Sequence, residues 1–292
     1  MFGIRQWFFS TVNNRYEHSS KLLFSGLYCA ITFILVAYTA YAWSTSNAWD
    51  VGYHPSFSYN GMENLIDTTG WTVEKIAWVY LAPPLWGLMI SVFSLIAYHL
   101  IDPIQTNLRT FLFWLSLNGF VLYFSYVLTG ILSGQVYTSK FFTGFVGFYS
   151  WLKWSKGTIY GILVIQLFLS LLYSFLYSKP ILQLNYSRLL ASRKQGKLII
   201  FLNVAFVPYL FGTLLIIMAT FPMNLNYQSV RIIAFLLVLA ACLLGIGFHR
   251  AKYISIVKGG LKPSGLLTLI FGVAALILLS RFLLSQSVKP LW

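Results

Sequence analysis

The chain has 292 residues, of which 58% are hydrophobic and only 9% charged, with a mean hydropathy of +0.74. Soluble globular chains carry about 25% charged residues, so these few charges cannot cover a water-facing surface, and a soluble fold is excluded. The formal net charge of +14 does not indicate a nucleic-acid partner, because the basic residues collect in short connections between apolar stretches, where anionic lipid headgroups attract them.

Seven apolar stretches have about the length that a membrane-spanning helix needs. They are residues 22–43, 76–100, 110–133, 158–178, 198–221, 232–248 and 265–284. The first is too long for the apolar core of a signal peptide, so we expect it to remain as a spanning helix. No linker-like segment divides the chain. The sequence therefore predicts an all-α integral membrane protein, with residues 1–292 forming a single polytopic bundle of about seven transmembrane helices.

Basic residues divide unevenly between the two sets of connections. Thirteen of the 20 lie in residues 1–21, 101–109, 179–197 and 249–264, and seven lie elsewhere. Short cytoplasmic loops are enriched in Lys and Arg, so this bias predicts a cytoplasmic N-terminus and a C-terminus on the opposite side. Four of the six acids lie in the first external loop, residues 44–75.

An aromatic segment over residues 134–157 follows the third stretch. It holds four Phe, Tyr149, Trp151 and Trp154, with Lys153 and Lys156 at its end. This composition is typical of an interfacial helix lying in the headgroup plane, which is the structure we expect. The alternative is a short re-entrant or irregular loop packed on the bundle.

Two spanning stretches contain prolines. Pro83-Pro84 can divide the second stretch into an interfacial turn and a shorter crossing helix. Pro208 should kink the fifth stretch, because its ring removes one backbone hydrogen bond.

Small and polar residues recur at helical spacing along the third stretch. They are Asn118, Ser125, Thr129, Gly130 and Gly134. Small residues let two helices approach closely, and polar side chains hydrogen-bond across the contact, so we interpret this set as a helix-packing seam. The alternative is the polar lining of a pathway. Gln166 in the fourth stretch also needs a partner, and Asn118 and Ser125 are the candidates in the third stretch.

His99 and Asp102 follow one another closely at the end of the second stretch. Residues three apart can share one helix face, which would suit a metal or a proton shuttle. Only two such ligands are present locally, so we expect a polar site at the membrane surface in which Arg109 holds the carboxylate ionised.

Two basic connections are expected to contact lipid headgroups or, as an alternative, an acidic partner protein. Their candidate residues are Arg188, Arg193, Lys194, Lys197, Arg250 and Lys252.

The sequence lacks the motifs of the common membrane catalysts. It has no HExxH and no glycine-rich nucleotide loop. Cys29 and Cys242 are isolated, without metal-type spacing. We expect no Asp, Glu, Lys or Arg in the deep interior, where pumps and ion-coupled transporters usually place such groups. No cofactor or metal is therefore predicted, and catalysis is not favoured.

These patterns lead to three functional hypotheses. The first is a non-catalytic subunit that docks or scaffolds other membrane proteins in a larger complex. The second is a transporter or binding protein for an apolar or lipid-like substrate, lined by the third stretch. The third is an interfacial membrane enzyme that uses His99 and Asp102.

Overall fold

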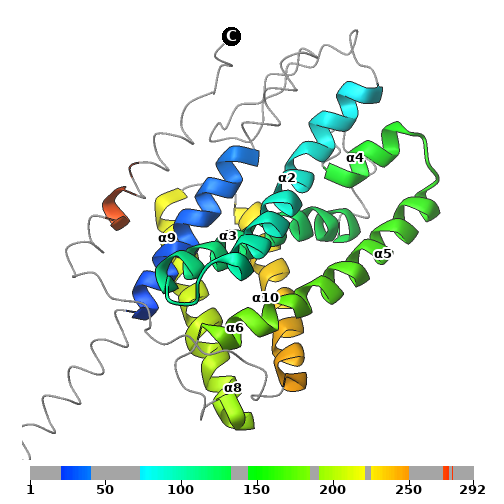
Figure 1. Cartoon of the computed structure of the whole chain (residues 1–292). Helices are drawn as coiled ribbons and strands as arrows, with labels where there is room; N and C mark the ends of the chain where they lie inside the picture. The colour runs from blue at the N-terminus through cyan, green and yellow to red at the C-terminus, as the bar shows by residue number, and fades with distance from the viewer. Residues whose placement is uncertain are drawn as a thin grey trace, which may run out of the picture.

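The structure, a computed structural model, describes residues 21–40, 73–132, 144–184, 191–220, 225–249, 272–275 and 278. Within this part of the chain every regular element is a helix (Figure 1). Six helical segments are long and apolar enough to cross a membrane, as a multi-pass membrane protein requires: Lys21–Ala40, Tyr80–Leu100, Thr106–Leu132, Lys156–Gln183, Lys194–Met218 and Val230–Phe248. The seventh expected stretch lies mostly outside the described residues, as does most of the loop 44–75, so a count of seven stays a prediction.

The helices follow one another in a simple order. After the helix Lys21–Ala40 come α2 (Val73–Leu100), α3 (Thr106–Leu132) and the short α4 (Gly144–Trp151). The next span is continuous through α5 (Lys156–Ser174), η2 (Phe175–Tyr177) and α6 (Ser178–Gln183). The following one consists of α8 (Lys194–Phe201), η3 (Leu202–Phe206) and α9 (Val207–Thr220), and α10 covers Leu225–Phe248.

Helix α3 forms the centre of the bundle. It contacts α2, α4, α5 and α10, and most of its residues are buried. Trp114 is fully buried, where its ring stacks on Phe235 of α10 and its Nε1 donates to Ser25 Oγ at 2.9 Å. A helix that is apolar on all sides belongs in the core of a bundle, and α3 occupies that position.

Two pairs of glycines allow helix backbones to approach closely. A Cβ atom at Gly87 of α2 would lie 2.7 Å from the carbonyl oxygen of Gly119 of α3, and a Cβ at Gly119 would lie 2.7 Å from the carbonyl oxygen of Gly87. Gly212 of α9 approaches Gly26 in the same way, with a Cβ-to-oxygen distance of 2.8 Å. Side chains larger than glycine do not fit at either crossing.

The prolines do not interrupt their helices. Helix α2 contains Pro83 and Pro84 and runs unbroken to Leu100, so the second stretch does not split. Before Pro208 the chain forms a π-helical turn, in which the N–H of Val207 donates to the carbonyl of Leu202, five residues back. A wider turn accommodates the missing N–H of proline, and it lies where the sequence predicts a kink.

The described part of the aromatic segment, residues 144–157, begins with a short helix. This α4 (Gly144–Trp151) packs against α2, α3 and α5. Phe145, Val146 and Tyr149 are buried against the bundle. The ring of Trp154, in the turn into α5, stacks on Tyr149 at 5.0 Å. This packing against other helices is the feature that we expected of the alternative, a loop packed on the bundle. A position of this segment in the headgroup plane stays a prediction.

We predict that Gly119→Ala destabilises the bundle, whereas Gly161→Ala does not. The added methyl at Gly119 meets backbone of α2, so the helices must separate at a cost of about 1–3 kcal/mol. Gly161 has nothing within 4 Å of its Cβ position, and alanine there favours the helix by up to about 1 kcal/mol. Thermal unfolding in detergent measures both variants. Equal midpoints would show that the crossing tolerates a side chain.

Candidate functional site: a groove with a basic end

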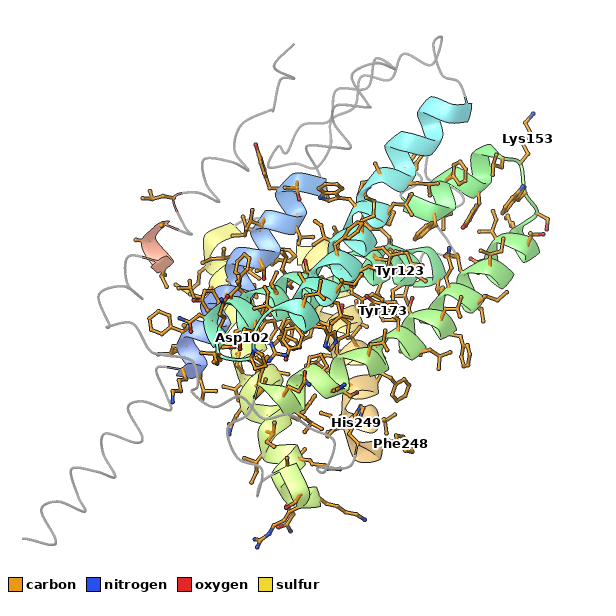
Figure 2. The ribbon with its side chains drawn as sticks, in the orientation of Figure 1. Asp102, Tyr123, Lys153, Tyr173, Phe248 and His249 are labelled. Atoms are coloured by element: carbon orange, nitrogen blue, oxygen red, sulfur yellow. The ribbon has the colours of Figure 1, made fainter. Side chains whose placement is uncertain are left out.

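A groove of about 440 Å³ lies between α2, the junction of α5, η2 and α6, and the end of α10. Its apolar walls are Val92, Leu95, Ile96, Phe175 and Leu176, and its polar groups are His99, Tyr173, Lys179 and His249. Ile96 is 51% exposed and Leu176 is 53% exposed, so the groove opens on the outer surface of the bundle. Figure 2 shows Tyr173 in the middle of the bundle and His249 at the end of α10.

Three elements bring basic groups to one end of this groove. His99 lies in the last turn of α2, Lys179 on α6 and His249 directly after α10. Asp102 is the only acid whose side chain the structure describes, and it does not line the groove. Within the described residues, the groove is therefore apolar along its walls and positively charged at its end.

His249 is held in its neutral form. Burial lowers the pKa of its imidazole, and the nearby charges of Lys179 and Lys197 lower it further. At pH 7 the ring therefore offers one N–H donor and one acceptor rather than a second positive charge beside Lys179.

Lys197 is a predicted headgroup contact that has other partners in the structure. Its Nζ lies 2.6 Å from the carbonyl oxygen of His249, 3.2 Å from that of Ile246 and 3.4 Å from that of Gly247. An ammonium group has three donors, and all three are directed at the end of α10. This geometry makes Lys197 a cap for the carbonyls of that helix.

The expected polar site of His99, Asp102 and Arg109 is not assembled. Helix α2 ends at Leu100, so Asp102 lies in the following turn, where its Oδ1 accepts the N–H of Ile104 at 2.9 Å. His99 and Asp102 therefore do not share one helix face, which the sequence had left open. Figure 2 shows Asp102 and His249 on separate parts of the molecule.

Arg109 points into the bundle. It is 3% exposed, and its guanidinium lies 4.2 Å above the ring of Tyr98. Its Nη2 donates to Gln183 Oε1 at 3.4 Å. These contacts replace the expected pairing with the carboxylate of Asp102.

A second arginine, Arg231, is buried in the bundle near the start of its apolar helix, Val230–Phe248. Arg231 is 1% exposed, and its guanidinium lies 4.2 Å above the ring of Phe33. The sequence placed Arg231 just before the sixth stretch, but α10 begins at Leu225. The extra turns carry Arg231 into the bundle, where an aromatic face receives its charge.

The predicted packing residues lie at helix contacts, with different partners from those expected. The Nδ2 of Asn118 donates to Cys29 O and to Thr32 Oγ1, both at 2.9 Å, which ties α3 to the helix Lys21–Ala40. The Nε2 of Gln166 donates to Tyr149 OH at 3.2 Å. Gln166 therefore pairs with α4 rather than with the third stretch.

The other members of the seam have local roles. Ser125 and Thr129 donate to backbone carbonyls four residues back in α3, at 2.6 and 2.8 Å. Gly130 faces α4 and α5, because a Cβ there would lie 2.9 Å from Val146 and 3.1 Å from Leu163.

The remaining basic candidates are placed in part. Arg193 and Lys194 are exposed at the start of α8. Gly134 of the seam and the basic residues Arg188, Arg250 and Lys252 lie outside the described residues.

A buried network of hydroxyl groups, which the sequence did not indicate, joins three helical spans. The OH of Tyr177 lies 2.7 Å from Ser91 Oγ and 2.8 Å from Ser116 Oγ, and Ser116 Oγ donates to the carbonyl of Ser91 at 2.7 Å. Tyr173 OH adds a contact of 3.1 Å to Ser91 Oγ. Each hydroxyl has one proton, and the chain Tyr173 to Ser91 to Tyr177 to Ser116 uses each proton once.

Comparisons with known proteins do not assign this chain to a family. No family model matches it, and neither the curated proteins nor the solved structures contain a match.

We predict that Tyr177→Phe destabilises the protein by about 1–3 kcal/mol, because the buried hydroxyls of Ser91 and Ser116 each lose one hydrogen-bond partner. Tyr173→Phe removes the 3.1 Å contact to Ser91 from a half-buried ring and should cost less. Chemical or thermal unfolding in detergent compares the two variants. If Tyr173→Phe proves the more damaging, the network does not depend on Tyr177 as its geometry indicates.

The pKa of His249 predicts a loss of stability in mild acid. Because the folded pKa is lowered, the unfolded chain binds more protons, and stability decreases as the pH falls below the unfolded value of about 6.5. The unfolding midpoint should therefore drop between pH 7 and pH 5, and the drop should be smaller in His249→Gln. A wild-type protein that gains stability over this range would contradict the sign of the shift.

Proposed function

We propose that this chain is a membrane-embedded binding protein for a lipid-like amphiphile held in the groove. The observation that supports this function best is that the groove combines apolar walls with a basic end. Val92, Ile96 and Leu176 give a hydrocarbon chain an apolar surface, and His99, Lys179 and His249 give a headgroup its hydrogen-bond partners. Ligand sites commonly have volumes of about 300–1,000 Å³ and combine apolar walls with a few polar groups.

The surface around the groove supports entry from the bilayer. Phe93 on α2 is 64% exposed, and Leu169 and Leu172 on α5 are 57% and 47% exposed. In a membrane these side chains face lipid, which covers apolar surface that water would not tolerate. An amphiphile can therefore move sideways from the bilayer into the groove without passing through water.

The groove is not lined by the third stretch, which the sequence analysis had offered as the lining for a lipid-like substrate. Asn118 and Gly130 of the third stretch are buried against other helices, so the seam does not border the groove. An interfacial enzyme is less favoured than a binding protein, because Asp102 does not line the groove. Scaffolding of other membrane proteins stays a second hypothesis that no described contact favours.

We also propose that the basic end of the groove faces the cytoplasm. Segments 101–109, 179–197 and 249–264 belong to the more basic set of connections, which the positive-inside rule places there. The burial of Arg109 and Arg231 removes one residue from each set and leaves the direction of the bias unchanged.

Filling the groove tests the proposed function. Ile96→Trp should occlude it and reduce the lipid that remains bound after purification in mild detergent, as measured by native mass spectrometry. Leu214→Trp places the same ring at an exposed position on α9 that does not line the groove and should leave bound lipid unchanged. Equal lipid retention by the wild type and both variants would contradict binding in the groove.

A further inference from the structure

We propose that the groove selects phospholipids of net negative charge, with the phosphate held among His99, Lys179 and His249. This inference rests on the proposed function, since it names the headgroup of the amphiphile bound there. It depends on four features of the basic end, which are its donors, the capped end of α10, the buried Arg109 and the absence of a facing acid among the described residues.

The donors converge from three separate elements. The Lys179 side chain is exposed on α6, and His99 and His249 lie at the ends of α2 and α10 on the same groove. An ammonium and two imidazoles can each donate to a phosphate oxygen, and hydrogen bonds in which the donor or the acceptor is charged are about twice as strong as neutral ones. The phosphate would lie where the apolar walls end.

Lys197 caps the C-terminal end of α10, whose partial negative charge would otherwise repel an anion. The C-terminal end of a helix carries roughly half a negative charge on its free carbonyls. In this structure Lys197 Nζ is directed at the carbonyls of Ile246, Gly247 and His249. The charge of Lys197 offsets the end of the helix, so the charge of Lys179 is left to act on a ligand.

Arg109 adds a further positive charge behind the groove. It packs on Tyr98, the residue next to His99, and its Nε and Nη1 have no hydrogen-bond partner. No carboxylate neutralises it within the described residues, since Asp102 accepts from the turn N–H of Ile104. Charges in a protein interior are screened less than charges in water, so Arg109 should favour anions at this end and disfavour the ammonium of a zwitterionic headgroup.

The neutral state of His249 fits an anion site that is ready to take up a proton. Lys179 and Lys197 disfavour its charged form, and a phosphate beside the ring would favour it. Binding of an anionic lipid should therefore be accompanied by proton uptake and should strengthen as the pH falls.

Competition between two lipids tests the inference. The full chain in mild detergent is mixed with equal amounts of phosphatidylglycerol and phosphatidylcholine that carry the same acyl chains, and native mass spectrometry measures the bound ratio. We expect the wild type to prefer phosphatidylglycerol by about tenfold, equivalent to about 1.4 kcal/mol. Lys179→Gln should reduce this preference to about threefold or less.

Two matched variants control for charge and folding. Lys153→Gln removes the same charge from an exposed site in the turn before α5 that does not line the groove, and it should keep the tenfold preference. Lys179→Arg keeps the positive charge and should keep the preference as well. A loss of preference in Lys153→Gln equal to that in Lys179→Gln would overturn the site in favour of a general surface effect.

The outcomes also separate this inference from the proposed function. If the wild type binds both lipids equally and Ile96→Trp binds neither, the groove binds lipid but does not select charge. If Ile96→Trp retains both lipids, both proposals fail. If inorganic phosphate alone displaces phosphatidylglycerol at millimolar concentration from the wild type, the site holds a free phosphate rather than a lipid headgroup, and the inference is overturned.

Discussion

The close approach of α2 and α3 at Gly87 and Gly119 is the constraint on which the groove depends. With the two backbones in contact there, Ser116 of α3 reaches the carbonyl of Ser91 of α2, one helical turn beyond Gly87. Tyr177 then binds both serines and fixes η2 against α2. Lys179 follows two residues later, which brings its ammonium to the same groove as His99.

The interior and the outer surface of the bundle use polar groups in different ways. Inside, Asn118 and Gln166 each donate to a neighbouring helix, and Arg109 and Arg231 lie over aromatic rings. An unpaired polar group in an apolar medium costs several kcal/mol, so these contacts fix which helices are neighbours. On the outer surface, polar groups gather at the end of the groove, where a ligand can reach them.

The six helices that are long and apolar enough to span a membrane could be predicted from the sequence, because a spanning helix needs only a long apolar stretch. The predicted ends of these helices were less accurate, since α10 begins seven residues before the expected start of its stretch. Because of this difference, the sequence did not indicate that Arg231 is buried. Partners across helices could not be predicted either. Asn118 binds a helix about 90 residues earlier in the chain, and the groove joins α2 to α10. Such contacts depend on how the bundle closes, which local patterns do not specify.

The most direct test is an experimental density map of the full chain in nanodiscs that contain phosphatidylglycerol. We expect a lipid in the groove, with its acyl chain along Ile96 and Leu176 and its phosphate beside Lys179. A well-resolved map in which the groove is closed by protein, or open without lipid while ordered lipids bind elsewhere, would contradict a lipid-binding function for this site.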